Sequence, residues 1–169
     1  MGRLHGIGIV SRDMAVALGA LGVAARASGL VLDVRRERPY AAYDELEVQP
    51  AGASAGDVAA RFHVRAQEAH ESLRLVREAA RRLPPGPIVV PLTATPAVSD
   101  SALSAAEGPR GASWVWLRAG PDGTIDRLRL RSASFANWPV VAAAVPGNLV
   151  PDFPLINKSF ELCYACTDR

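Results

Sequence analysis

The stretch DVAARFHVRAQEAHESLRLVREAARRL, residues 57–83, decides the fold, because it is the longest segment of the chain without glycine or proline. Asp57 is a preferred N-cap residue, and the prolines of PPGP, residues 84–87, cannot continue a helix. The segment therefore predicts one long helix. Small or apolar residues recur along it at alternating spacings of four and three, which predicts a face for packing against other helices. That face consists of Phe62, Ala66, Ala69, Leu73, Val76, Ala80 and Leu83.

The chain before this helix is predicted to be partly helical. Residues 6–10 favour a short strand, and Ser11 can cap a helix that runs to about Ser28, where Gly29 can end it. Residues 30–49 contain a central proline with short alternating segments on either side. For them we expect a loop plus a strand.

After the long helix, the clearest feature is a β-hairpin. SWVWLRAG and DRLRLRS, residues 113–120 and 126–132, flank the turn residues Asp122 and Gly123. The other expectations are a short strand at residues 88–92, a loop with one short helical turn at residues 93–107, and helical elements at residues 137–145 and 153–162.

Together these elements predict the α+β class, with a long-helix bundle and a small antiparallel hairpin. A chain of 169 residues with 49% apolar residues is long enough to bury one core, so we expect a single domain over residues 1–169. Residues 1–83 should be mainly helical, and residues 84–169 should carry the hairpin and a C-terminal tail.

Charge and hydropathy exclude two classes of function. The net charge is only +2 and the arginines are scattered along the predicted helices, so we expect no nucleic acid as a partner. No apolar run approaches the roughly 18 residues that cross a bilayer. The N-terminus also lacks the pattern of a secretory signal. We therefore expect a cytoplasmic protein that reaches a membrane only through partners.

The two cysteines, Cys163 and Cys166, form a Cys-x-x-Cys pair near the C-terminus and are the main chemical clue. Thiolates at this spacing can bind one soft metal ion or two adjacent ones. A self-contained zinc site needs four ligands, and His5, His63 and His70 lie far away in sequence without ligand spacing. A thioredoxin-type redox pair is expected at the start of a helix in a βαβ unit. Two incidental cysteines remain the third alternative.

The chain as a whole resembles one superfamily, through blocks whose order and spacing make chance matches improbable. The blocks are GRLHGIGIVSRDMAVALG, ARASG, VRRERPYAAYDE, GDVAARFHVRAQEAHESLRLV, EGPRG, SFANWP and CTDR. They resemble the large subunits of nickel–iron hydrogenases and the corresponding 49-kDa, quinone-site subunit of respiratory complex I, the NADH-quinone oxidoreductase. The retained cysteines and the CTDR ending resemble most the energy-converting hydrogenases of the formate hydrogenlyase and hydrogenase-4 type.

This resemblance implies a nickel–iron centre. Cys163 would be a terminal nickel ligand and Cys166 a bridge from nickel to iron. Glu161 and Leu162 stand where the family pattern has Asp and Pro, and the first cysteine pair of the family has no counterpart here. Arg169 occupies the position after which hydrogenase maturation removes an extension, so we expect a mature terminus.

The resemblance also assigns residues that approach the metal. Arg110, with Pro109 before it, matches the family arginine beside the diatomic ligands of iron, where a guanidinium can donate hydrogen bonds and act electrostatically in hydrogen cleavage. Ser134 and Asn137 of SFANWP match an element near the same ligands. Without the family, Arg110 would be a surface arginine in a turn, and Ser134 and Asn137 would be cap or turn residues.

One further block, RRERPY, carries Arg36, Arg38 and Tyr40 and resembles a family segment near the active site, although a salt-bridged loop explains it equally well. His63 and His70 are expected to be solvated helix residues.

The implied partners are an iron–sulfur small subunit, membrane-arm subunits and the missing N-terminal half of the large subunit, at the inner face of the cytoplasmic membrane. Two alternatives stay open. One is a complex-I-like subunit that handles quinone or serves an NAD-linked complex without nickel. The other is a non-catalytic scaffold module. A face that normally packs against the missing half would be exposed here, so we expect the isolated chain to self-associate.

Overall fold

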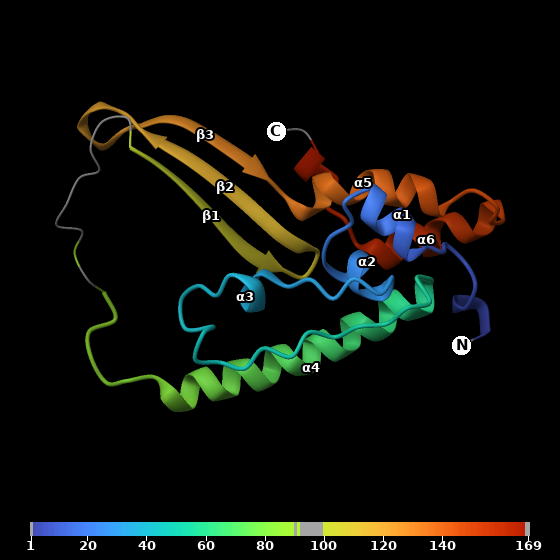
Figure 1. The fold of residues 1–169 in the computed structure, drawn as a ribbon, viewed down its shortest axis with the longest axis horizontal. Helices are drawn as coiled ribbons and strands as arrows, with labels where there is room; N and C mark the ends of the chain where they lie inside the picture. Colours follow the sequence, from blue (N-terminus) through green and yellow to red (C-terminus); the bar gives the residue numbers. More distant parts are fainter. Residues whose placement is uncertain (1, 90, 92–99, 168–169) are drawn as a thin grey trace.

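The computed structural model describes residues 2–89, 91 and 100–167 and confirms the α+β class. The helices of this part are α1 (Arg12–Ala17), α2 (Gly22–Ala27), α3 (Val34–Glu37), α4 (Val58–Arg82), α5 (Ala133–Ala144) and α6 (Phe153–Phe160). The strands are β1 (Ser101–Gly108), β2 (Gly111–Ala119) and β3 (Ile125–Arg131). In Figure 1, α1, α2, α5 and α6 gather into one body, the sheet extends away from it, and α4 runs beneath both.

The long helix α4 forms as predicted. The Asp57 carboxylate accepts a hydrogen bond of 2.8 Å from the backbone N–H of Ala60 and caps the first turn. The helix ends at Arg82, because Pro84 disfavours helical geometry in the residue before it. Its first half packs against α2 and α6, which leaves the second half extending beyond the helical body (Figure 1).

The prediction of which face of α4 packs against the other helices is wrong. Every member of that set is exposed in this chain, and its large apolar side chains keep between 57% and 76% of their surface in contact with solvent. The residues that α4 buries are Val58, Ala60, Arg61, Val64 and Leu75. Helices α2 and α6 therefore select the face that carries Val58 and Val64. We call the exposed set Phe62, Ala66, Ala69, Leu73, Val76, Ala80 and Leu83 the α4 stripe.

For the N-terminal helix, the predicted cap at Ser11 is confirmed, but the prediction of one continuous helix to about Ser28 is wrong. The Ser11 hydroxyl accepts a hydrogen bond of 3.2 Å from the N–H of Met14, as a cap does. The single helix predicted beyond it is divided into α1 and α2, because Gly19 and Gly22 adopt left-handed φ values of 63° and 58°. No strand forms at residues 6–10, all of which the structure describes.

Two further segments differ from prediction. Residues 30–49 contain the short helix α3, capped by the Asp33 side chain, and turns instead of a strand. Residues 101–107, predicted as loop, belong to β1. Of the strand predicted at 88–92, positions 90 and 92 lie outside the described residues, and Ile88 and Val89 are not in a strand.

The sheet has the order β1-β2-β3 and is antiparallel throughout. Ser101 lies opposite Arg118 at one end of β1, and Gly108 lies opposite Gly111 at the other. The predicted hairpin is confirmed as β2 and β3, joined by the 3-10 turn Pro121–Gly123. β1 consists mainly of small residues, which have little β-propensity alone, so its pairing with β2 defines the strand.

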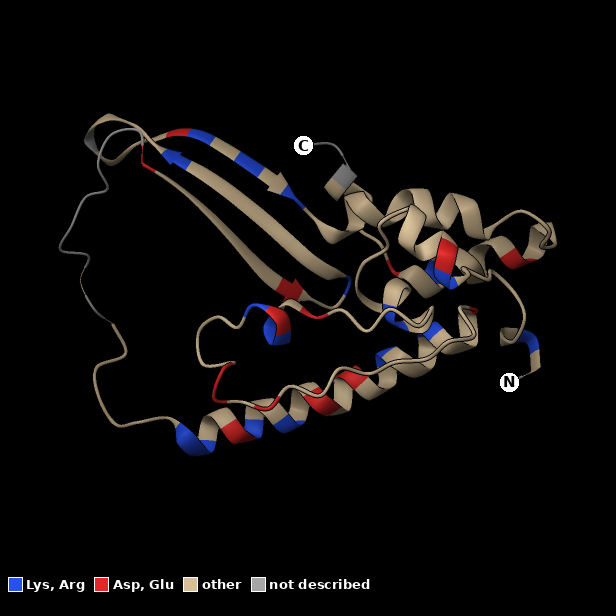
Figure 2. Ribbon diagram, viewed as in Figure 1, with Lys and Arg blue, Asp and Glu red and all other residues tan. Residues whose placement is uncertain are grey.

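The C-terminal helices form the main core with α1 and α2. Helix α5 begins at Ala133, four residues before the predicted start, because the Ser132 hydroxyl accepts a hydrogen bond from the Phe135 N–H and caps it. Buried members of the core are Val10, Ala15, Ala20, Ala24, Ala25, Val58, Val140, Val141, Ala144, Ile156, Phe160 and Leu162. Helix α5 contains no charged residue, whereas α4 carries basic and acidic bands along its length (Figure 2). Among the described residues, no helix is both long and apolar enough to cross a membrane.

Candidate metal centre

The chain reaches its two cysteines through a sharp turn after α6. Glu161 adopts a left-handed conformation with φ 55° and ψ 38°, and its N–H donates a 3.0 Å hydrogen bond to the Lys158 carbonyl. This turn ends α6 and directs the tail toward α5. Leu162 is buried in the main core and anchors the tail. Cys163 and Cys166 consequently lie half-buried rather than in a free end.

Both cysteines are attached to the start of α5 through their backbones. The Cys163 N–H donates a 3.1 Å hydrogen bond to the Ser134 hydroxyl oxygen. The Ser132 hydroxyl donates a hydrogen bond of 3.4 Å to the Cys166 carbonyl. Ser134 is almost fully buried, so its position is fixed by packing. These contacts hold the two cysteine backbones beside the start of α5.

The surroundings of Cys163 favour its ionised form. The pKa of the Cys163 thiol is lowered from its ordinary value, first by a hydrogen bond with the Cys166 side chain and then by the backbone N–H groups of Cys166 and Ala165. The positive charge of Arg110 acts in the same direction. The thiolate is the form of cysteine that acts as a nucleophile and as a metal ligand, so this environment favours the reactive form of Cys163.

Arg110 lies on the two-residue turn that joins β1 and β2, next to Pro109. Its Nε donates a hydrogen bond to the backbone carbonyl of Glu161, the residue at which the cysteine tail begins. The β1–β2 turn and the tail are therefore in direct contact. The terminal nitrogens of the guanidinium have no hydrogen-bond partner among the residues that the structure describes.

Asn137 fixes the backbone of the Arg110 turn from α5. Its amide oxygen accepts from the Leu21 N–H at 2.9 Å, and its amide nitrogen donates to the carbonyls of Leu21 and Arg110 at 3.2 and 3.1 Å. The approach is so close that a Cβ on Gly22 would lie 2.3 Å from the Arg110 carbonyl oxygen. Only glycine fits there, which ties the loop before α2 to the turn.

The structure thus brings together all six residues that the sequence marked, namely Pro109, Arg110, Ser134, Asn137, Cys163 and Cys166. Their roles toward a metal stay predictions. Of the weaker candidates, Tyr40 accepts a 3.0 Å hydrogen bond from the Glu107 N–H and so supports the strand that leads to the turn. Arg36 and Arg38 are exposed, and Arg169 lies outside the described residues.

A buried ionic cluster behind the Arg110 turn was not predicted. Arg26, which is 1% exposed, donates to Glu68 at 2.5 Å, to Glu107 at 3.0 Å and to the Leu32 carbonyl at 2.7 Å. Glu107 in turn accepts from the Val34 N–H at 3.2 Å. Burial raises the pKa of Glu107 against the pull of Arg26. The cluster joins α2, α3 and α4 to the end of β1. The signal for it was present in sequence: Glu107 opens EGPRG, and Arg26 interrupts an apolar segment.

Arg61 is a second buried cation that sequence reasoning missed. It is fully buried and donates to the carbonyls of Gly56 and Gly8 at 2.8 and 2.9 Å and to the Ser159 hydroxyl at 2.8 Å. Its guanidinium carbon also lies 4.2 Å from the centre of the Phe160 ring. Burial lowers the pKa of Arg61 to about 10. Because Ser159 and Phe160 are on α6, Arg61 positions the helix from which the cysteine tail leaves.

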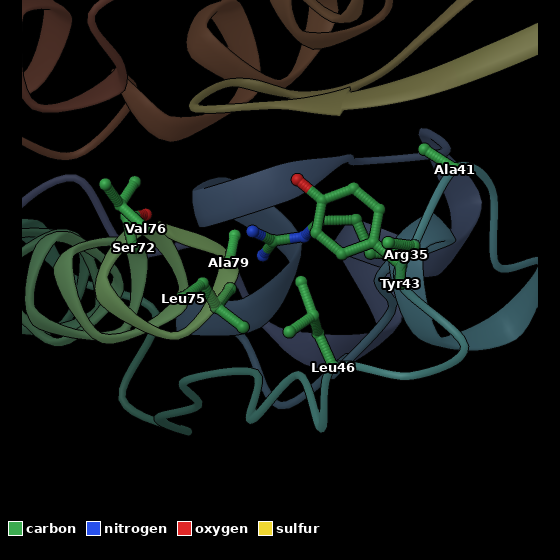
Figure 3. Close-up of a pocket in the computed structure, with 9 residues that line it drawn as sticks. Arg35, Ala41, Tyr43, Leu46, Ser72, Leu75, Val76 and Ala79 are labelled. Atoms are coloured by element: carbon green, nitrogen blue, oxygen red, sulfur yellow. The ribbon is translucent and has the colours of Figure 1, made fainter. Parts of the chain in front are cut away.

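Two of the cavities beside α4 differ in their relation to the cysteines. Figure 3 shows one of about 310 Å³, with Arg35, Tyr43 and Leu46 on one side and Leu75, Val76 and Ala79 of α4 on the other. None of the marked residues lines it. The other, of about 270 Å³, is lined in part by Arg26, Glu68, Glu107 and Pro109, and so lies directly behind the Arg110 turn.

The donor atoms at this site fit half of a soft-metal centre. Two adjacent sulfurs, one with a lowered pKa, are donors that soft metals prefer. The described residues contain no group of three or more His, Cys, Asp or Glu side chains that could hold a metal. A metal bound by the two thiols would therefore take its further ligands from beyond the described part of the chain.

The chain matches the family described as "Respiratory-chain NADH dehydrogenase, 49 Kd subunit" over residues 1–97 and 92–169. It is 37% identical over 168 residues to the carbon monoxide-induced hydrogenase of Rhodospirillum rubrum. The aligned region covers 99% of this chain and 46% of that protein. Identity to formate hydrogenlyase subunit 5 of Escherichia coli strain K12 is 36%, over 99% of this chain and 29% of that protein.

A third relative belongs to the other class. The chain is 39% identical over 172 residues to a subunit of the NADH-quinone oxidoreductase of Salinispora tropica, over 100% of this chain and 44% of that protein. These comparisons confirm the resemblance to hydrogenases and to complex I subunits. The chain spans less than half the length of each of these relatives.

Proposed function

Because the chain belongs to the family of the 49-kDa subunit of respiratory-chain NADH dehydrogenase, we propose that it is the C-terminal part of the large subunit of an energy-converting hydrogenase-like oxidoreductase complex. One observation carries the proposal. Three elements far apart in sequence, the β1–β2 turn, the start of α5 and the tail, meet around the two cysteines through the contacts of Arg110, Ser134 and Asn137.

In this proposal Cys163 and Cys166 would hold nickel and iron, and two further thiolates would come from outside this chain. When bound, such a centre supplies the two-electron chemistry that forms or splits hydrogen. The hydrogen bonds of Cys163 and the charge of Arg110 favour its thiolate, which is the form that binds a metal. Its sulfur is also a base that can accept and hold a proton beside the reaction.

Arg110 supplies positive charge at a fixed position. Its Nε is bound to the Glu161 carbonyl and its backbone carbonyl to Asn137, so the guanidinium plane is held, and no described residue accepts a hydrogen bond from its terminal nitrogens. A guanidinium held in this way can bind an anionic ligand and stabilise negative charge that develops during reaction. Ser134 acts indirectly, by positioning the Cys163 backbone.

The electrons are proposed to pass to an iron–sulfur small subunit, within a complex anchored by membrane-arm subunits at the inner face of the cytoplasmic membrane. Several relatives are named as subunits or components of larger enzymes, which supports partners in general.

Two alternatives have specific support. The identity of 39% to an NADH-quinone oxidoreductase subunit favours a complex-I-like role that works on quinone, in an NAD-linked complex, without nickel. Glu161 and Leu162, which precede the cysteines in place of Asp and Pro, favour a scaffold without a metal. The retained Cys163 and Cys166 and the lowered pKa of Cys163 favour the hydrogenase proposal over both.

The test is hydrogen-dependent dye reduction by the complete native complex carrying Arg110→Lys. Lysine keeps the positive charge but lacks the planar guanidinium with its paired N–H donors. We therefore expect kcat to fall about 100-fold or more while nickel and iron content is retained. Arg118→Lys, on the distant end of β2, is the matched control and should keep wild-type kcat. Wild-type kcat in the Arg110 variant, or a native complex that reduces quinone with NADH but never uses hydrogen, would contradict the proposal.

A further inference from the structure

β3 is a sheet edge with both faces open to solvent. Among the described residues it pairs with β2 alone, and all seven of its residues, Ile125–Arg131, are exposed. Figure 1 shows it on the side of the sheet away from α4. An edge strand presents a row of unpaired backbone N–H and C=O groups, which is a template for a further strand.

Arginine occupies every second position along this edge, as Arg127, Arg129 and Arg131. Side chains two positions apart in a strand lie on the same face, so the three guanidinium groups form one row. None of them has an acidic partner among the residues that the structure describes; Arg129 contacts the Leu128 carbonyl at 3.5 Å. Figure 2 shows the basic bands along β3. We call these three residues the arginine row.

The neighbouring strand does not neutralise this row. The register places Arg131, Arg129 and Arg127 opposite Trp114, Trp116 and Arg118 of β2. Arg118 is already paired with the Asp126 carboxylate at 2.5 Å. Within the described sheet, the face beside the row is therefore aromatic and basic, without a free acid to complement it.

The other face of β3 is apolar. Leu128 and Leu130 lie opposite Leu117 and Val115 of β2, and they remain 42% and 43% exposed. A strand that added to this edge would cover them with its own alternate side chains. β3 thus presents a two-residue period, basic on one face and apolar on the other, next to free backbone groups.

We propose that β3 is the docking edge for an acidic β-strand of a partner protein. Carboxylates at every second position of that strand would pair with the arginine row, apolar residues between them would pack on Leu128 and Leu130, and its backbone would extend the sheet to four strands. This surface does not involve the cysteines, so the inference does not depend on the metal proposal.

A second copy of this chain is a poor occupant. Pairing β3 with β3 would place two arginine rows against each other, and like charges opposite one another destabilise a sheet. Charged residues on an edge can also serve only to discourage pairing. If the arginine row only discouraged pairing, no acidic strand would bind. The same experiment therefore decides between a docking edge and a protected edge.

The test uses the full chain and two blocked six-residue peptides of equal composition, one alternating Glu and Val and one with three Glu followed by three Val. We expect the alternating peptide to bind roughly tenfold or more tightly than the block peptide, with an affinity that falls as salt rises, because only alternation matches both faces of β3. It should also slow amide hydrogen exchange at alternate residues of β3.

Charge reversal provides the matched variants. Arg127→Glu with Arg129→Glu and Arg131→Glu should abolish binding of the Glu peptide and gain binding of an alternating Lys and Val peptide. The variant with Gln at all three positions should no longer bind the Glu peptide and should not bind the Lys and Val peptide either. Protection of its α4 amides from hydrogen exchange would show that it folds. Reversing Arg36, Arg77 and Arg81, which lie on other elements, should change nothing. Equal binding of both Glu peptides, binding that survives reversal, or no protection in β3 would overturn the proposal.

Discussion

At the scale of single residues, contacts to the backbone hold the two cysteines of the candidate centre in place. Ser134 holds the Cys163 N–H, and Arg110 holds the carbonyl of Glu161 just before it. These contacts set the direction in which the tail leaves α6. They also place the guanidinium where its charge lowers the pKa of the Cys163 thiol, after the larger effect of the Cys166 hydrogen bond.

The first prediction concerns the pH dependence of Cys163 alkylation in the metal-free chain. Iodoacetamide reacts with the thiolate, so a lowered pKa moves the rise in rate to a lower pH than for an ordinary thiol, whose pKa is about 8.5. Cys166→Ala removes the largest cause of the shift and should move the rise to higher pH. Arg110→Ala should move it the same way by less. Peptide mass mapping across pH measures this, and an unchanged profile in both variants would refute the described environment.

Some residue roles could be predicted and others could not. Cys163, Cys166 and Arg110 stand in short local motifs, so the sequence alone marks them. The part that Asn137 plays required the fold, because its partner Leu21 is 116 positions away and is held through backbone atoms. Gly22 is equally hidden, since a glycine required by close backbone approach looks like any other glycine until the neighbouring strand is placed.

At the scale of elements, the Arg26 cluster joins α2 to the carboxylates of α4 and β1, Glu68 and Glu107. Asp33 also lies 3.8 Å from the guanidinium. Glu107 stands three residues before Arg110 on the same hairpin. The cluster therefore sets where the Arg110 turn meets the body, although no member of it touches a cysteine among the described contacts.

The second prediction follows from this burial. Arg26→Met keeps much of the volume but leaves buried carboxylates without a cation, so it should lower the free energy of unfolding at neutral pH by about 3–5 kcal/mol. Part of this loss should return below the ordinary pKa range of Glu, where the orphaned carboxylates are protonated. Arg81→Met, exposed on α4, should change it by less than about 0.5 kcal/mol. Urea unfolding at two pH values measures the free energy of unfolding of both variants. Equally small effects of the two substitutions would contradict a stabilising role for the Arg26 cluster.

The elements show why local signals succeed or fail. Helix α4 has its cap, its proline stop and its composition within its own sequence, and it forms as predicted. The four-three spacing of the α4 stripe is also a local pattern. Which face α4 buries, however, depends on where α2 and α6 lie. β1 is the opposite case: its alanines and serines carry no strand signal, and the strand exists because β2 pairs with it.

At the scale of the whole molecule, the α4 stripe is a long apolar surface without a packing partner among the described residues. Its spacing is that of a helix–helix seam, yet Leu73 and Val76 are 57% and 66% exposed. The chain spans less than half the length of the relatives described above. An apolar surface of this kind is a site of association.

The third prediction is that the isolated chain self-associates through the α4 stripe. Sedimentation velocity should show dimers or larger species that dissociate on dilution, because burying two apolar stripes against each other is favourable. Leu73→Glu with Val76→Glu should give a monomer at the same concentration. Gln67→Glu with Arg81→Glu, which adds negative charge to α4 outside the stripe, should leave the association unchanged. A clean monomer of the unaltered chain at high concentration would show this prediction to be wrong.

The central claim is that Cys163 and Cys166 are metal ligands, and elemental analysis tests it most directly. Nickel, iron and zinc should be measured in the complete native subunit purified without oxygen, with a Cys163→Ser, Cys166→Ser variant beside it. The account predicts nickel and iron near one each per subunit and the loss of nickel in the variant. Nickel absent from both proteins would contradict the account and favour the complex-I-like or scaffold role.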